Sequence, residues 1–173
     1  ESKSDSNGLL VNRATKGLYT PGSTFKILTM LEYIRENPDS YGDYEYYCKG
    51  TTELTGFTLQ CSYRTAHGTC DLKRSLAKSC NCSFVNIGKA INLDSLYNLC
   101  NNLLFNKDLK LGFECSKSTM NIGSTSTEFD IAQTVIGQGT TLVTPMHMSL
   151  LMGAIANDGV AMEPTLILEK IDY

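Results

Sequence analysis

A helix start followed by apolar residues at helical spacing is the feature that most constrains how this chain can fold. Apolar side chains recur three or four positions apart along residues 23–34, directly after Pro21-Gly22, at Ile27, Met30, Leu31 and Ile34. This period predicts an amphipathic helix whose apolar face packs on a core. We expect the helix to end near Asn37, because a residue that precedes proline disfavours helical backbone angles.

Helix signals recur along the chain, whereas strand signals are few. Asp71 and Thr144 stand where their side-chain oxygens can cap helices, and Pro145 occupies a favoured first-turn position. The expected helices cover residues 71–78, 83–91, 94–105, a segment ending at Val135, and 145–157. The expected strands are 44–48 and 57–61, paired as a short β-hairpin, and a terminal strand at 165–171. The sequence therefore predicts a mainly α fold with few strands and no large sheet.

The composition and charge of the chain limit the classes of partner that it can bind. The 173 residues are 42% hydrophobic and 19% charged, which suits one domain with a sizeable core, preceded by a flexible arm at residues 1–12. The net charge of -3 and the scattered basic residues argue against nucleic acid and anionic membranes as partners. The sequence has no long apolar run, and it begins with mostly polar residues. We therefore expect neither a membrane span nor a signal peptide, and we expect any targeting signal to lie outside this sequence.

Seven cysteines are many for this length, but the number is odd and no paired Cys-x-x-Cys spacing occurs. The Cys80-Asn81-Cys82 step is too tight for a metal knuckle, so we expect no metal site and no cofactor. Cys48 and Cys61 stand at the ends of the expected hairpin strands. A disulfide between them would close a loop of about 14 residues and contribute roughly 3 kcal/mol. Free buried thiols that pack as small hydrophobes are the favoured interpretation.

Ser23 and Lys26 form a Ser-x-x-Lys pattern at the start of the first expected helix. A serine hydroxyl needs an adjacent base to attack a carbonyl, and residues three apart on a helix share one face. The positive end of the helix favours a developing oxyanion and disfavours a protonated lysine, and burial would lower the lysine pKa further. These arguments make Ser23 a candidate nucleophile and Lys26 its candidate base.

Two further serines bear on this hypothesis. Ser75 and Lys78 form a second Ser-x-x-Lys copy, but it lies inside an expected helix, and we interpret it as ordinary helix surface. Ser79 and Asn81 fall at a helix junction, where a hydroxyl and an amide can point into one cleft, although an asparagine there can also be a cap. In that cleft Ser79 can relay a proton and Asn81 can donate to a substrate carbonyl.

The chain resembles class B penicillin-binding proteins, whose signature is Ser-x-x-Lys, then Ser-x-Asn, then Lys-Thr-Gly. The resemblance covers residues 13–164 and is carried by three segments in the family's order: Tyr19 to Lys26; His67-Gly68 leading into Leu76 to Phe84; and Ile136-Gly137-Gln138-Gly139 through Thr144-Pro145 to Gly159. It implies the helical part of an α+β transpeptidase fold that is shared with serine β-lactamases.

The resemblance also implies an activity, D,D-transpeptidation of peptidoglycan. Ser23 would attack the penultimate D-Ala carbonyl of a stem peptide, and Lys26 would take its proton. Ser79 would pass a proton to the leaving nitrogen, and Asn81 would hold the substrate amide. A β-lactam would acylate Ser23. The full-length protein would act at the extracytoplasmic face of a bacterial membrane, anchored there with partners in cell-wall synthesis.

One departure from the family pattern is that no Lys-Thr-Gly or Lys-Ser-Gly occurs in these 173 residues. The family's opening sheet strands are also not recognised, so the sequence resembles a partial transpeptidase domain. One oxyanion-hole amide would be lost with that triad, and such a loss typically lowers turnover about 100- to 1,000-fold. We therefore expect weak or no activity from this segment alone. The alternatives are a serine β-lactamase or β-lactam sensor, and a non-catalytic interaction domain.

Overall fold

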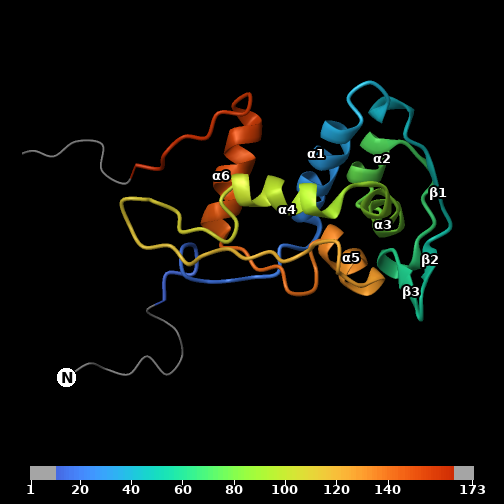
Figure 1. Ribbon diagram of the computed structural model, residues 1–173, viewed down its shortest axis with the longest axis horizontal. Coiled ribbons are helices and arrows are strands. Elements are labelled where there is room, and N and C mark those ends of the chain that lie inside the picture. The colour runs from blue at the N-terminus through green and yellow to red at the C-terminus, as the bar shows by residue number, and fades with distance from the viewer. Residues whose placement is uncertain (1–10, 166–173) are drawn as a thin grey trace, which may run out of the picture.

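The computed structural model describes residues 11–165, and helices account for most of its regular structure (Figure 1). The helices are α1 (Lys26–Glu36), α2 (Leu72–Ala77), α3 (Asn81–Ala90), α4 (Leu93–Asn102), α5 (Glu128–Val135) and α6 (Pro145–Ala156). The strands are β1 (Tyr46–Cys48), β2 (Thr51–Leu54), β3 (Phe57–Gln60) and β4 (Gly68–Cys70). The mainly α fold with few strands that the sequence predicts is confirmed.

Helix α3 lies at the centre of the packing, because it contacts α1, α5, β1 and β3. Phe84 and Ile87 on this helix are fully buried. Phe25 packs edge to face against Phe105, with 6.0 Å between the ring centroids, and extends the core toward α6. The core therefore runs directly behind the segment that carries Ser23 and Lys26.

Side-chain caps begin the helices where the sequence predicts them. The Asp71 carboxylate accepts from the Arg74 amide at 2.6 Å at the start of α2, and the Thr144 hydroxyl accepts from the His147 amide at 3.2 Å at the start of α6. Boundaries differ by a few residues: α3 begins at Asn81, two residues before the expected start, and α4 ends three residues earlier than expected.

The predicted pairing of residues 44–48 with 57–61 is wrong. Strand β3 pairs instead with β2, in an antiparallel hairpin that places Leu54 opposite Phe57. The tight turn between them contains Gly56, whose φ of +82° suits glycine. Strand β1 is left to pair with β4. A nearby turn residue thus decides the register, and the predicted terminal strand at 165–171 falls, apart from Thr165, outside the described residues.

The buried face of α1 also differs from the predicted apolar face. Leu31 is 38% exposed, and Met30 and Ile34 only border the core. Three polar residues of α1 are instead fully shielded from solvent: Lys26, Thr29 and Glu32. Each of these polar side chains has a hydrogen-bond or ion-pair partner. The Thr29 hydroxyl, for example, donates to the carbonyl of Val135 at 2.9 Å. Hydrophobic periodicity alone cannot identify a helix face that is buried through hydrogen bonds and ion pairs.

Extended segments far apart in the sequence run side by side below the helices (Figure 1). Tyr19 pairs with Val143, and Thr119 pairs with Leu142, both antiparallel. The Gly22 amide donates to the Gly137 carbonyl at 2.7 Å. These contacts fix the chain immediately before Ser23 to the segment that follows α5.

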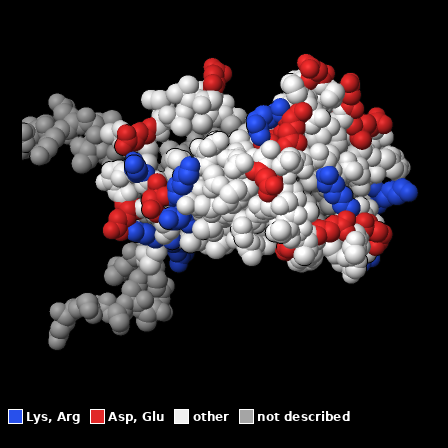
Figure 2. Space-filling view, in the orientation of Figure 1, with Lys and Arg blue, Asp and Glu red and all other residues white. Residues whose placement is uncertain are grey.

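Charged side chains of both signs are distributed in small groups on the face shown in Figure 2, rather than in one continuous basic patch. This distribution agrees with the small net charge of the sequence. In the described part of the chain, no helix combines the length and the apolar character that crossing a membrane requires.

Candidate active site

Ser23 lies in a 3-10 turn, Gly22–Phe25, that leads directly into α1. Its side chain is exposed, whereas Phe25 anchors the turn in the core. The Thr24 hydroxyl donates to the Pro21 carbonyl at 2.7 Å and closes the turn. The structure therefore places Ser23 at the start of a helix, as the sequence predicts, on a turn that Phe25 anchors.

Lys26, in the first turn of α1, extends its side chain toward Ser23, Ser79 and Asn81. Its Nζ donates to Asn81 Oδ1 at 2.7 Å, to the Ser79 carbonyl at 2.8 Å and to Ser79 Oγ at 2.9 Å. The contact to Ser23 Oγ is longer, at 3.3 Å. The ammonium group also lies 5.4 Å from the centroid of the Phe84 ring. The buried Lys26 ammonium thus contacts each of the other three candidate site residues, Ser23, Ser79 and Asn81.

Ser79 and Asn81 reach the cluster from the junction between α2 and α3. Ser79 adopts a left-handed backbone conformation with a φ of +49°, and its hydroxyl donates to Ser23 Oγ at 2.7 Å. Such a conformation in a residue other than glycine costs roughly 1–2 kcal/mol and is often found at functional sites. The side-chain amide of Asn81 is held in place because it donates to the Gln60 carbonyl at 3.0 Å.

Burial lowers the pKa of Lys26 to about 8, although the nearby thiols of Cys80, Cys61 and Cys82 oppose the shift. The side chain is fully shielded from solvent, and the charged form of an amine loses hydration when it is buried. A substantial fraction of Lys26 is therefore neutral slightly above neutral pH, so its amine can accept a proton.

The arrangement offers a continuous path for a proton. Ser23 Oγ is within hydrogen-bond distance of Ser79 Oγ, which in turn contacts Lys26 Nζ. A nucleophile, a base and a second hydroxyl that touches both are the parts needed for acyl transfer through a serine. The structure thus brings together Ser23, Lys26, Ser79 and Asn81, although 55 residues separate Lys26 from Asn81 in sequence.

Ser75 of the second Ser-x-x-Lys copy is not on the helix surface, contrary to our expectation, whereas Lys78 is exposed. Ser75 is fully buried on α2, and its Oγ lies 2.6 Å from the Oγ of Ser83 on α3. The correction has a simple cause, since α2 packs Ser75 against α3. Lys78 makes no hydrogen bond with Ser75, so this pair lacks the geometry of the first copy.

Sequence reasoning missed a cluster beside these residues. Cys48, Cys61, His67 and Cys80 converge from four separate segments, with their ligand-forming atoms within 4.8 Å of one another. Their sequence spacings of 13, 6 and 13 resemble no zinc-ribbon pattern. The signal that could have found them is the number of cysteines between residues 48 and 82.

A large hollow of about 720 Å³ lies elsewhere, between α4, α6 and the segment 107–111. None of Ser23, Lys26, Ser79 or Asn81 lines it. The chemistry of the candidate site, rather than the size of a cavity, therefore identifies where a reaction can occur. His147 at this hollow is held by the Leu103 carbonyl at 2.8 Å, as befits a packing residue.

Comparison with known proteins agrees with this arrangement. Residues 1–172 match the family described as the penicillin binding protein transpeptidase domain. Stage V sporulation protein D of Bacillus subtilis is 30% identical over 162 residues, covering 89% of this chain and 24% of that protein. The peptidoglycan D,D-transpeptidase PbpA of Mycobacterium tuberculosis is 29% identical over 164 residues, covering 91% of this chain and 33% of that protein.

Solved structures show the same fold. The imipenem acyl-enzyme complex of penicillin-binding protein A from M. tuberculosis superposes with a TM-score of 0.82 at 25% identity, covering 93% of this chain and 38% of that chain. The D,D-transpeptidase domain of a peptidoglycan glycosyltransferase from Eggerthella lenta gives 0.82 at 26% identity, covering 92% and 42%. The chain thus spans about a quarter to a third of the curated relatives' length. It belongs to the penicillin-binding protein transpeptidase domain family.

Proposed function

We propose that this chain carries the nucleophile, base and proton relay of a serine D,D-transpeptidase that cross-links peptidoglycan and is acylated by β-lactams. The observation that carries the proposal is the contact of Lys26 Nζ with Ser23 Oγ, Ser79 Oγ and Asn81 Oδ1 at once. The names of the relatives support the reaction: one is a peptidoglycan D,D-transpeptidase, and another is an imipenem acyl-enzyme.

Acylation begins when Ser23 Oγ attacks the penultimate D-Ala carbonyl of a stem peptide. The neutral Lys26 amine takes the hydroxyl proton as the new carbon–oxygen bond forms. The developing oxyanion lies near the amides at the start of α1, because the first amides of a helix have no partner within it. Burial of Lys26 favours this step, since it lowers the pKa of the amine to about 8 and leaves part of the population neutral near neutral pH.

Collapse of the tetrahedral intermediate breaks the peptide bond. The Ser79 hydroxyl donates a proton to the leaving nitrogen of the terminal D-Ala, and Ser79 recovers one from the Lys26 ammonium 2.9 Å away. The product is an ester on Ser23. An amine of a neighbouring peptidoglycan strand then attacks this ester. Lys26 takes the proton of that amine and returns it to Ser23 Oγ. No atom outside the two peptides is consumed.

Asn81 has the role of a substrate anchor in this proposal. Its carbonyl oxygen is occupied by Lys26 at 2.7 Å, and its amide donates to the Gln60 carbonyl at 3.0 Å. The second contact ties the anchor to Gln60, the last residue of β3. A substrate carbonyl would accept from the same Asn81 amide, whose two N–H groups allow both contacts.

The segment alone is proposed to be weakly active. None of its 173 residues forms the Lys-Thr-Gly or Lys-Ser-Gly triad of the family, after which a second oxyanion amide is expected. Its partners in the whole protein are stem peptides, β-lactams and proteins of cell-wall synthesis, and the reaction takes place at the extracytoplasmic face of the membrane.

Labelling with a fluorescent penicillin tests the function on the whole protein that contains this chain. We expect covalent label on a peptide that includes Ser23, and complete loss of label in Ser23→Ala. Ser75→Ala is the matched control, because it removes the serine of the other Ser-x-x-Lys copy, and it should keep the label. Absence of label from a folded, full-length protein would refute the proposal, and fast release of hydrolysed penicillin would indicate a β-lactamase instead.

A further inference from the structure

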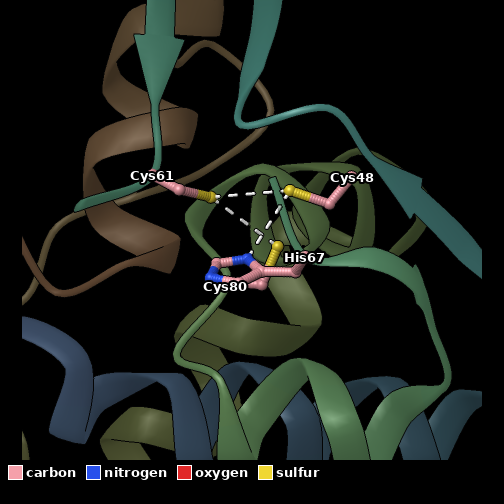
Figure 3. Close-up of side chains that lie close together, drawn as sticks. All are labelled: Cys48, Cys61, His67 and Cys80. Carbon is pink, nitrogen blue, oxygen red and sulfur yellow. Dashed lines mark hydrogen bonds between the residues drawn. The ribbon is translucent and has the colours of Figure 1, made fainter. Parts of the chain in front are cut away.

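Three cysteines and one histidine form a compact cluster beside the active-site residues, since Cys80 stands between Ser79 and Asn81 in the sequence (Figure 3). Cys48 ends β1, Cys61 follows β3, His67 precedes β4, and Cys80 caps α3. The Cys48–Cys61 and Cys61–Cys80 sulfur distances are both 3.7 Å, and Cys48 Sγ lies 3.6 Å from His67 Nδ1. The four side chains point toward one common centre.

These three distances agree with a tetrahedral zinc site. Zinc bonds of about 2.3 Å to sulfur place two thiolates ~3.8 Å apart, and a bond of about 2.0–2.1 Å to nitrogen gives ~3.6 Å between sulfur and nitrogen. A disulfide requires about 2.05 Å between sulfurs, which none of these pairs shows. Three cysteines and one histidine are also one of the usual ligand sets for structural zinc.

Backbone amides donate to two of the sulfurs. The Gly50 amide donates to Cys48 Sγ at 3.3 Å, and the Ser83 amide donates to Cys80 Sγ at 3.4 Å. Outer hydrogen bonds of this kind orient metal ligands and tune their basicity. Cys48, Cys61 and Cys80 are buried at 0–1% exposure, as the ligands of structural zinc centres commonly are.

We propose that Cys48, Cys61, His67 and Cys80 bind one Zn²⁺ ion, which fixes the position of the Ser79 loop. On binding, each of the three thiols releases its proton to solvent, while the neutral imidazole coordinates through Nδ1. Cys80 stands between Ser79 and Asn81, the two residues that contact Lys26. The metal thus connects β1, β3 and β4 to the loop that carries the relay and the anchor. It binds no substrate.

Metal content of the full chain, purified without chelators, is the direct test. We expect about one equivalent of zinc per chain by elemental analysis. Replacement of zinc by Co²⁺ should produce thiolate-to-cobalt charge-transfer absorption and the d–d bands of a tetrahedral site. His67→Gln should weaken Zn²⁺ binding at least about 100-fold. This variant is chosen because His67 is only half-buried and its loss leaves the core intact.

Cys100→Ala is the matched control, since Cys100 is equally buried but lies on α4, outside the cluster. It should retain the zinc and the cobalt spectrum, and so should Ser23→Ala, which separates metal binding from acylation. A folded chain that contains no zinc and gives no cobalt spectrum would overturn the proposal. So would a Cys48–Cys61 disulfide found by mass spectrometry, or zinc retained unchanged in His67→Gln.

Discussion

The hydroxyl of Ser79 donates to the hydroxyl of Ser23 at 2.7 Å across 56 positions of sequence. This contact depends on a strained backbone, because Ser79 has a φ of +49°. The strain turns the Ser79 side chain toward Ser23 while its carbonyl accepts from Lys26. Backbone strain and proposed chemistry therefore meet at one residue, and substitution can separate them.

Ser79→Gly and Ser79→Ala both remove the relay hydroxyl, and we expect both to slow penicillin acylation by about 100-fold or more. Glycine tolerates a positive φ, whereas alanine does not. Ser79→Gly should therefore be more stable than Ser79→Ala by about 1 kcal/mol, measured by urea denaturation. Equal stability of the two variants would show that the left-handed conformation is relaxed in solution.

The depressed pKa of Lys26 predicts how acylation depends on pH. Below a pKa of about 8 the side chain is an ammonium that cannot accept the Ser23 proton, and above it the amine is neutral. The acylation rate should therefore rise about tenfold per pH unit between pH 6 and pH 7 and level off above about 8. Stopped-flow measurement of acylation by a chromogenic β-lactam checks this profile.

Lys26→Gln is the companion variant, since it keeps a hydrogen-bonding side chain but has no base. We expect it to lower the acylation rate by about 100- to 10,000-fold and to abolish the rise with pH. A variant that kept the same pH profile at a reduced rate would mean that another group takes the proton.

The loop after α5 supports the Ser23 turn through a close backbone contact. A methyl group on Gly137 would lie 2.0 Å from the carbonyl oxygen of Gly22, and Gly137 has a φ of +73°. Gly137→Ala should therefore destabilise the fold by more than the ~1–2 kcal/mol expected of conformational strain alone, and should reduce acylation because the turn must move. Thermal unfolding and penicillin labelling measure the two effects.

Gly159→Ala provides the control for conformational strain. Gly159 has a similar φ of +87°, but an added methyl group would meet nothing within 4 Å. This variant should lose only the strain energy and keep its labelling. Equal effects of the two substitutions would argue against a supporting role for the Gly22–Gly137 contact.

Local signals in the sequence predicted most of the helices. Asp71, Thr144 and Pro145 mark helix starts that the structure confirms, because a cap depends only on a few neighbouring amides. The same holds for the Ser23 turn, where Pro21-Gly22 and the following period suffice. The site itself was assembled from motif order, and the structure confirms that its four residues lie together.

Contacts between distant segments were not predictable in the same way. The pairing of β1 with β4 depends on the Thr51–Gln60 hairpin, whose two-residue turn at Gly56 we did not recognise. The cysteine cluster requires that four segments converge, which no spacing rule encodes. The polar face of α1 is buried because partners on other elements satisfy it, as Val135 does for Thr29.

An ion pair on α1 joins a buried carboxylate to an exposed guanidinium. Glu32 is fully shielded from solvent, and Arg35, which is 58% exposed, pairs with it at 2.6 Å. Arg35→Met leaves the carboxylate buried without its cation, and we expect a loss of about 1–3 kcal/mol in the free energy of unfolding. The double variant Glu32→Met with Arg35→Met should be less destabilised than Arg35→Met alone, because no charge then remains buried.

Lys117→Met is the surface control for this pair. Its partner Asp108 is 80% exposed and 3.4 Å away, so solvent screens the interaction and the expected loss is below about 1 kcal/mol. Urea denaturation of the unmodified protein and the three variants measures these losses in the free energy of unfolding. If Arg35→Met and Lys117→Met lost equal stability, the Glu32 carboxylate would have to reach water when its partner is removed. The inward face of α1 would then be open to solvent near Glu32.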